Sequence, residues 1–340
     1  MKKEFHLGFS ILRSIMCFMV ILIHCWNAGN AQNVMKFIAW ARVFSVPTFM
    51  MMSFLLVQPS LIEHDKKKMK NRFERLLIPQ FGWAVIYWAV YGIIDLLLNK
   101  GWESKISDLL WQIFFGHRLN TAMWYQVDLI YLTLLFLIVI VLCKKNYTSV
   151  LIILGMAALI IQYSGINMVF ETLRYELSYP IGRFSEMLPI AVVGFVISSM
   201  NLLEKLKNFR FITAILAVFL ILMEYAFGFF SDVTGYGYSG VRMIVISFAF
   251  IALFYMIPFE KLPMKAHNII KTLTSYTLGI YCMHRLVLSI LNGMIEKLDW
   301  GKYISLNTFS SAIIIYILCY MVAFIGTFLF RKTKLKILFN

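Results

Sequence analysis

The fold is decided by the stretch MWYQVDLIYLTLLFLIVIVLC, which occupies residues 123–143. Asp128 is its only charged side chain, and leucine, isoleucine and valine make up more than half of it. A helix needs about 20 predominantly apolar residues to cross a bilayer. This stretch therefore predicts a membrane-spanning helix, and the rest of the chain can be divided on the same scale.

Nine further apolar runs flank it, at residues 8–27, 36–58, 77–98, 148–164, 183–200, 210–230, 241–258, 272–293 and 306–330. The segment 103–116 is amphipathic, so we expect it to lie on the membrane surface. The stretch 165–182 is too polar to span. The sequence thus predicts an all-α polytopic transmembrane helical bundle of about ten spans, built as a single transmembrane domain over residues 1–340.

The composition excludes a water-soluble protein. Of the 340 residues, 61% are hydrophobic and 14% are charged, with a mean hydropathy of +0.77. Soluble domains are about 45–50% apolar and about 25% charged. So much apolar surface could not be hidden from water, and the lipid bilayer is the expected solvent.

The basic residues indicate the orientation of the chain. With a cytoplasmic N terminus, the inside segments hold 20 Lys and Arg residues and the outside segments hold 8. Cytoplasmic loops carry such an excess, so both termini are predicted to be cytoplasmic. The net charge of +15 lies in short clusters between apolar runs, which excludes a nucleic-acid partner.

The N-terminal segment resembles a signal peptide, but Arg13 and His24 interrupt its apolar run. Since the apolar region of a signal peptide is normally uncharged, we expect an uncleaved first span. No metal is expected, because the cysteines show neither a CxxC motif nor a zinc-site spacing. The five cysteines are Cys17, Cys25, Cys143, Cys282 and Cys319.

Ionisable side chains inside spans are costly and mark functional sites by default. Those in the predicted spans are Arg13, His24, Arg42, Asp128, Glu186, Glu224, Arg242, His284 and Arg285. Structural ion pairs within the protein interior are the simpler interpretation for Glu224, Arg242 and Arg285.

Arg13 and His24 are eleven residues apart in the first predicted helix. That separation is three turns plus about 20°, so both side chains share one face, about 16 Å apart along the axis. Histidine is the side chain best suited to proton transfer near neutral pH. A packed, hydrogen-bonded histidine remains the alternative for His24.

A basic segment at residues 65–76 follows the second span, and we expect it to be a loop. Arg72 and Arg75 would share a face of a helical turn there, and two guanidinium groups suit a bidentate grip on phosphate. Most of this charge is also explained by the orientation rule alone.

Several motifs in the chain are similar to those of a known family. Arg13 is followed after ten residues by His24, and Arg72-Phe73-Glu74-Arg75 is followed by Pro79. Further matches are the stretch Ser45–Leu55, where the usual glycine after Ser53 is missing and Phe54 follows directly, the motif Met123-Trp124-Tyr125, and the late helix Tyr276–His284. Together these motifs, in this order, resemble the acyltransferase-3 family of membrane acyltransferases, in a short form without a soluble esterase-like domain.

The resemblance implies an enzyme that moves an acetyl or succinyl group from cytoplasmic acyl-CoA, most often acetyl-CoA, to a hydroxyl of a cell-surface or exopolysaccharide sugar. His24 would be the catalytic base or a transient acyl carrier, and Arg72 and Arg75 would hold the CoA phosphates. Arg13 would line the path of the pantetheine arm.

Two further residues have two interpretations each. Trp124 is either a platform for a sugar ring or an interfacial anchor, and His284 either orients a partner or packs in the core. The resemblance also implies a bacterial plasma membrane and an association with polysaccharide synthesis or export machinery.

Two other functions fit the intramembrane charges. A transporter or flippase of a saccharide or lipid-linked saccharide would use the same charges, but should tolerate the loss of His24. In a structural subunit of a polysaccharide synthase, Arg72 and Arg75 would serve only as orientation signals.

Overall fold

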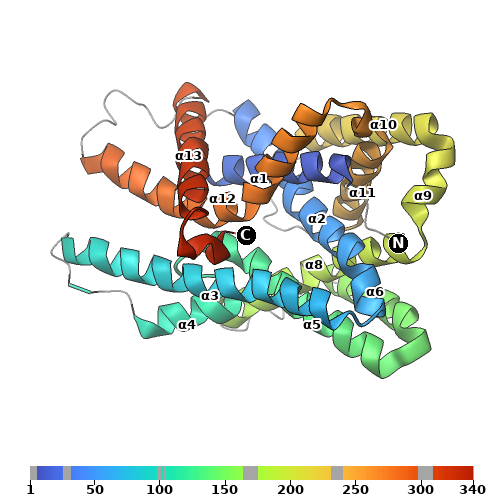
Figure 1. The fold of residues 1–340 in the computed structure, drawn as a ribbon, viewed down its shortest axis with the longest axis horizontal. Helices are drawn as coiled ribbons and strands as arrows, with labels where there is room; N and C mark the ends of the chain where they lie inside the picture. Colours follow the sequence, from blue (N-terminus) through green and yellow to red (C-terminus); the bar gives the residue numbers. More distant parts are fainter. Residues whose placement is uncertain are drawn as a thin grey trace. The chain divides into compact units, whose positions relative to one another are not determined.

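The computed structural model (Figure 1) describes residues 6–25, 32–97, 101–102, 105–163, 175–230, 240–297 and 309–339. Within these ranges the secondary structure is helical and contains no strand. The helices are α1 (Leu7–Cys25), α2 (Gln32–Ile62), α3 (Lys66–Leu97), α4 (Ile106–Phe115), α5 (Trp124–Cys143), α6 (Tyr147–Tyr163), α8 (Tyr175–Ser199), α9 (Leu202–Leu206), α10 (Arg210–Phe230), α11 (Val241–Met256), α12 (Met264–Lys297) and α13 (Phe309–Phe330).

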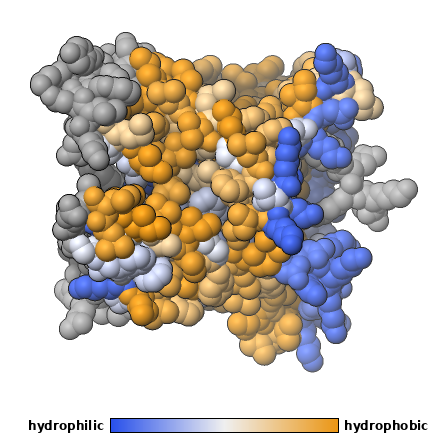
Figure 2. Space-filling model, turned by 60° about the vertical axis from the view of Figure 1, so that its left-hand side comes forward, coloured by the Kyte–Doolittle hydropathy of each residue, from blue (hydrophilic) through white to orange (hydrophobic). Residues whose placement is uncertain are grey.

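The described residues contain nine helical stretches that are long and apolar enough to cross a membrane. One of them, Thr121–Tyr163, has 43 residues and contains both α5 and α6, which meet at the 3₁₀ turn Lys144–Asn146. Each of the ten predicted runs therefore overlaps one long helix, and the protein is an all-α polytopic membrane protein. Figure 2 shows apolar side chains over most of the visible face, with hydrophilic ones gathered toward its edges.

Three helices extend beyond the predicted runs. The prediction of a loop at residues 65–76 is wrong, because α3 begins at Lys66 and continues without a break through its apolar part. Likewise, α12 runs from Met264 to Lys297 and α8 begins at Tyr175. Hydropathy detects only the part of a helix that suits hydrocarbon, whereas helical hydrogen bonding continues into the polar flanks.

The chain forms two compact units, each assembled from segments far apart in sequence. The first unit comprises residues 1–23, 31–65 and 132–277, and the second comprises residues 24–30, 66–131 and 278–340. Each unit is described by itself.

In the first unit, α2 and α8 approach closely. A Cβ atom on Gly194 would overlap the Met51 carbonyl oxygen, so only glycine permits this approach. The Gln58 side chain donates to Ser199 Oγ (2.9 Å) and accepts from Ser198 Oγ (3.0 Å). A row of aromatic rings from Phe54 through Phe136 to Phe195 fills the core, with ring centroids 4.5 and 5.3 Å apart.

Also in the first unit, α1 packs along α12. Thr274 Oγ1 donates to the Ser10 carbonyl (2.9 Å), and Cys17 Sγ donates to the Thr277 carbonyl (3.5 Å). Because the residue numbers of both helices rise together from contact to contact, the two helices run in the same direction. The predicted topology requires this of the first and ninth spans.

The second unit is organised around one aromatic face of α3. Trp83, Tyr87 and Tyr91 are spaced four residues apart, with neighbouring ring centroids 6.1 and 5.8 Å apart. The Trp83 indole donates to the Leu338 carbonyl (3.0 Å) in the 3₁₀ helix Lys334–Leu338. Phe339, 2% exposed, packs edge-on against Trp83, which fixes the C-terminal segment on α3.

The amphipathic segment forms α4, which packs against α3. Trp102 packs on Trp88, and Gln80, near the start of the apolar part of α3, donates to the Gln112 carbonyl (2.8 Å). α4 therefore runs back along α3, and its place at the membrane surface stays a prediction. The residues from Gly116 to Met123, which we call the α4–α5 turn, lead directly into α5.

The buried backbone groups of a non-helical turn need hydrogen-bond partners within the protein. Gln112, fully buried, accepts from the amides of Leu119 (3.0 Å) and Asn120 (2.8 Å) and donates to the Asn120 carbonyl (3.1 Å). Asn120 Oδ1 in turn accepts from the Ala122 amide (2.9 Å). The buried amides thus hold the turn in one conformation immediately before α5.

Candidate active site

Two histidines from opposite ends of the sequence lie side by side in the second unit. The rings of His24, in the last turn of α1, and His284, in α12, have centroids 5.2 Å apart and are tilted by 34°. His24 is half-buried and His284 is fully buried. The sequence marked both residues as candidates, and the structure brings them together.

The hydrogen bonding of His284 determines which of its ring nitrogens carries a proton. Nδ1 lies 2.5 Å from the Tyr281 carbonyl oxygen, which can only accept, so Nδ1 is the donor. In the neutral ring Nε2 then carries a lone pair. Nε2 is buried and finds no hydrogen-bond partner among the described residues. His284 thus offers a buried acceptor within the ring pair that it forms with His24.

The α4–α5 turn lies against the same part of α12. The Tyr281 hydroxyl donates to the Ala122 carbonyl, and Arg285 donates to Thr121 Oγ1 (3.4 Å). Tyr125 packs edge-on against Tyr281, with ring centroids 6.2 Å apart. Residues of α12, the turn and the first turn of α5 therefore surround the histidine pair.

Trp124 is the first residue of α5 and is 7% exposed, with its ring edge-on to Tyr125 at 6.2 Å. An interfacial anchor presents its ring to lipid headgroups, and the burial of Trp124 does not fit that interpretation. Its position next to Tyr125, which contacts Tyr281, places it near the histidines. The sugar-platform role stays a prediction.

Arg72 and Arg75 lie in the part of α3 before its apolar stretch, three residues apart on the helix and so on one face. Arg75 is exposed and Arg72 is half-buried. Tyr87, which contacts the α12 turn carrying His284, lies fifteen residues beyond Arg72 on α3, about 22 Å along the axis. The two arginines of α3 and the pair of histidines thus lie at two separate places in the second unit.

Arg13 is half-buried on α1, which is continuous from Leu7 to Cys25. Its expected separation of about 16 Å from His24 along one helix face therefore holds. Asp128 and Trp124 are both buried in the first turns of α5. The side chain of Arg42 lies outside the described residues.

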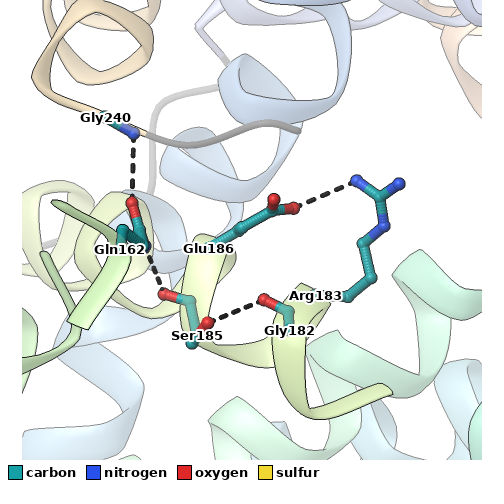
Figure 3. Close-up of polar contacts among 6 residues, drawn as sticks. All are labelled: Gln162, Gly182, Arg183, Ser185, Glu186 and Gly240. Carbon is teal, nitrogen blue, oxygen red and sulfur yellow. Dashed lines mark hydrogen bonds and ion pairs between the residues drawn. The ribbon is translucent and has the colours of Figure 1, made fainter. Parts of the chain in front are cut away.

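Other intramembrane charges form ion pairs in the first unit, as the simpler interpretation predicts. Arg242 of α11 pairs with Glu224 of α10. Arg183 Nη1 lies 3.0 Å from Glu186 Oε2 on α8 (Figure 3). Beside this pair, Gln162 donates to the Ser185 carbonyl (2.8 Å) and accepts from the Gly240 amide (3.1 Å). These charges stabilise helix ends, so they are weaker candidates for chemistry than His24 and His284.

Comparison with known families decides the class of protein. A family model described as an acyltransferase domain matches residues 6–332, nearly the whole chain. The chain belongs to the acyltransferase-3 family. As a member, this acyltransferase carries the family domain across its spanning helices and both units. No curated protein and no solved structure matches it at the required significance.

Family membership fixes the class of reaction that the site must perform. An acyltransferase needs a group that takes the proton of the acceptor as the acceptor attacks the acyl carbonyl. Within the described part of this acyltransferase, no three His, Cys, Asp or Glu side chains lie close enough together to hold a metal ion. Among the described residues of the second unit, the histidine pair is our candidate for this group.

The sequence did not single out several residues that build the site. Tyr87, Gln80 and Gln112 are uncharged and lie within apolar helices, so the search for intramembrane charges passed over them. A search for uncharged polar side chains in apolar runs would have found them, because each such group needs a partner in the membrane.

Proposed function

We propose that the protein is a membrane O-acyltransferase that moves an acyl group from acyl-CoA to a carbohydrate hydroxyl. The observation that carries the proposal is the His24–His284 pair with its buried acceptor nitrogen. A transporter would need no such arrangement, whereas acyl transfer needs an oriented base.

In the proposed reaction, His24 takes the proton of the acceptor hydroxyl while the hydroxyl oxygen attacks the thioester carbonyl. The new C–O bond forms, the C–S bond breaks, and the proton passes from His24 to the departing CoA thiolate. During the reaction His284 Nε2, which has no hydrogen-bond partner among the described residues, is proposed to accept the N–H of His24, so that the other His24 nitrogen is unprotonated and acts as the base. An acyl-histidine intermediate is the alternative route.

Arg72 and Arg75 are proposed to hold the CoA phosphates, and Arg13 to line the path between them and His24. Guanidinium groups bind phosphate in a bidentate manner, and the exposure of Arg75 suits a ligand that arrives from solvent. The donor is acetyl-CoA or succinyl-CoA. If Arg72 and Arg75 bind CoA while His24 performs the chemistry, the two arginines must lie at the cytoplasmic side, as the charge pattern predicts.

Trp124 is proposed to contact the sugar ring of the acceptor. The acceptor is a cell-surface or exopolysaccharide sugar, and the membrane is a bacterial plasma membrane. Each of these assignments rests on the motifs that the chain shares with its family. A polysaccharide synthesis or export assembly would supply such an acceptor to the outer side of the membrane.

The test is transfer of labelled acetyl or succinyl groups from CoA to candidate sugars by purified protein in detergent. His24→Ala should abolish transfer while acyl-CoA binding persists, and Arg72→Ala should weaken acyl-CoA binding. His267→Ala and Lys67→Ala are matched controls that should leave both unchanged, because His267 is near the start of α12 and Lys67 is an exposed neighbour on α3. If neither acyl-CoA binds the wild type, saccharide transport replaces acyl transfer as the leading function.

A further inference from the structure

A tyrosine of α3 bonds to the backbone of α12 in an unusual way. The Tyr87 hydroxyl donates to the Cys282 carbonyl (2.9 Å) and accepts from the Leu286 amide (2.8 Å). These two backbone groups are four residues apart and normally bond to each other in an α-helix. One side-chain hydroxyl therefore contacts both the acceptor and the donor of a single i→i−4 hydrogen-bond position in α12.

His284 lies midway between the two bridged residues. A side chain that inserts into the ladder of a helix locally opens or bends it. The same turn is held at two further points: His284 Nδ1 bonds to the Tyr281 carbonyl, and Cys319 Sγ donates to the His284 carbonyl (3.3 Å). Side chains of α3 and α13 thus both form hydrogen bonds with the turn of α12 that carries the buried histidine.

We propose that Tyr87 is a positioning residue for acyl transfer: its hydroxyl holds the Cys282–Leu286 turn so that His284 Nε2 faces His24. The inference rests on the proposed function. Tyr87 acts only through His284 and does not touch substrate. Its ring is fully buried in the aromatic face of α3, so the hydroxyl has a fixed position.

Removal of this hydroxyl leaves no buried group unpaired. In Tyr87→Phe the Leu286 amide and the Cys282 carbonyl are already in the relation that an ordinary helix bonds directly. The ring and its packing remain. The variant should therefore fold with a melting temperature close to that of wild type, while the turn around His284 loses its hydrogen bonds to α3.

The next aromatic residue along α3 supplies a matched control. Tyr91 lies one turn further, and its hydroxyl contacts the side chain of Ser289 (3.2 Å) rather than the backbone of α12. Tyr91→Phe removes the same atom from the same helix face toward the same partner helix. It leaves the two hydrogen bonds between Tyr87 and the backbone of the His284 turn in place.

The experiment compares kcat, KM for acetyl-CoA and melting temperature in wild type, His24→Ala, Tyr87→Phe and Tyr91→Phe. A misplacement of catalytic groups by about 1 Å costs on the order of 100-fold in rate. We expect Tyr87→Phe to lower kcat by roughly 10- to 100-fold with KM unchanged, on the same scale. Tyr91→Phe should stay within a factor of about two of wild type, as surface-side changes do.

Two results would overturn the positioning role. Equal kcat values in the two phenylalanine variants would show that the bridging hydroxyl does not affect the chemistry. A loss of folded Tyr87→Phe protein with normal kcat for the folded fraction would make the hydroxyl a purely structural clamp. Wild-type transfer that survives His24→Ala would instead remove the proposed function, and the role of Tyr87 with it.

Discussion

The two ring nitrogens of His284 have separate roles, and these roles predict the effect of substitutions at this position. The Tyr281 carbonyl holds Nδ1, and Nε2 is the remaining acceptor. His284→Ala removes both nitrogens, and with Nε2 the acceptor that is proposed to orient His24. We expect kcat to fall by roughly 10- to 100-fold, because loss of catalytic orientation costs on that order.

His284→Gln is the informative comparison, because its amide oxygen can occupy the place of Nε2 and accept from His24. It should recover part of the kcat lost in His284→Ala, with KM for acetyl-CoA the same in both. Equal kcat values in the two variants would refute the orienting role. The measurement is steady-state transfer of labelled acetyl groups.

A second histidine, His6, precedes α1 and should make stability depend on pH. Its ring stacks on Tyr255 (4.4 Å between centroids) and lies 4.0 Å from Glu260. Burial lowers its pKa from 6.5; Lys207 lowers the pKa further, and Glu260 and Glu204 oppose the shift. The folded protein thus releases a proton that the unfolded chain keeps below pH 6.5, so stability falls as the pH drops through that value.

We therefore expect the melting temperature in detergent to decrease from pH 7.5 to pH 5.5, and to decrease less in His6→Phe, which keeps the ring stack. The exposed His64 provides the control: His64→Asn should retain the wild-type slope. A His6→Phe slope equal to that of wild type would exclude a contribution from this ring.

At the scale of elements, the α4–α5 turn depends on one glutamine. Gln112 makes three hydrogen bonds to the backbone of Leu119 and Asn120. Each buried group left unsatisfied costs about 1–3 kcal/mol. Gln112→Ala should thus destabilise the protein by about 3 kcal/mol or more, measured by thermal unfolding in detergent. Ser107→Ala, on the exposed side of α4, should have little effect.

The contact of α2 with α8 gives a sharper test of packing. In Gly194→Ala the new methyl group would meet the Met51 carbonyl, so the two helices must separate. Overpacking of this kind costs about 1–3 kcal/mol. Gly182→Ala is the control on the same helix, because nothing lies within 4 Å of its added methyl group. Similar melting temperatures for the two variants would contradict the close approach.

The apolar runs predict the existence of every long helix, but not the structure between them. Their hydropathy cannot show that α4 packs along α3, because the apolar face of an amphipathic helix does not name its partner. Only the hydrogen bond from Gln80 to the Gln112 carbonyl, 32 residues away, reveals this contact.

The candidate site was predictable in part. His24 and His284 both stand out as ionisable residues in apolar helices, yet their contact depends on the parallel packing of α1 and α12. That packing is set by small polar side chains such as Ser14 and Thr274, which give no signal in a hydropathy profile. Tyr87 was invisible for the same reason, since its role lies in a backbone contact 195 residues away.

At the scale of the whole molecule, the charge pattern predicts that both termini and the basic start of α3 lie in the cytoplasm. Lys67→Cys should therefore resist a membrane-impermeant maleimide in intact cells and react after permeabilisation, whereas Lys105→Cys should react in both. The wild type sets the background from its native cysteines. Labelling of Lys67→Cys in intact cells would invert the topology and remove acyl-CoA from the Arg72 side.

The contact between Trp83 and Leu338 has a consequence for biogenesis. The two residues are separated by 255 positions, and ribosomes add about 5–20 residues per second, so Trp83 enters the membrane tens of seconds before its acceptor is made. The second unit also receives α12 and α13 only late in synthesis. A nascent chain therefore carries His24 long before His284, and acquires its histidine pair only when translation is nearly finished.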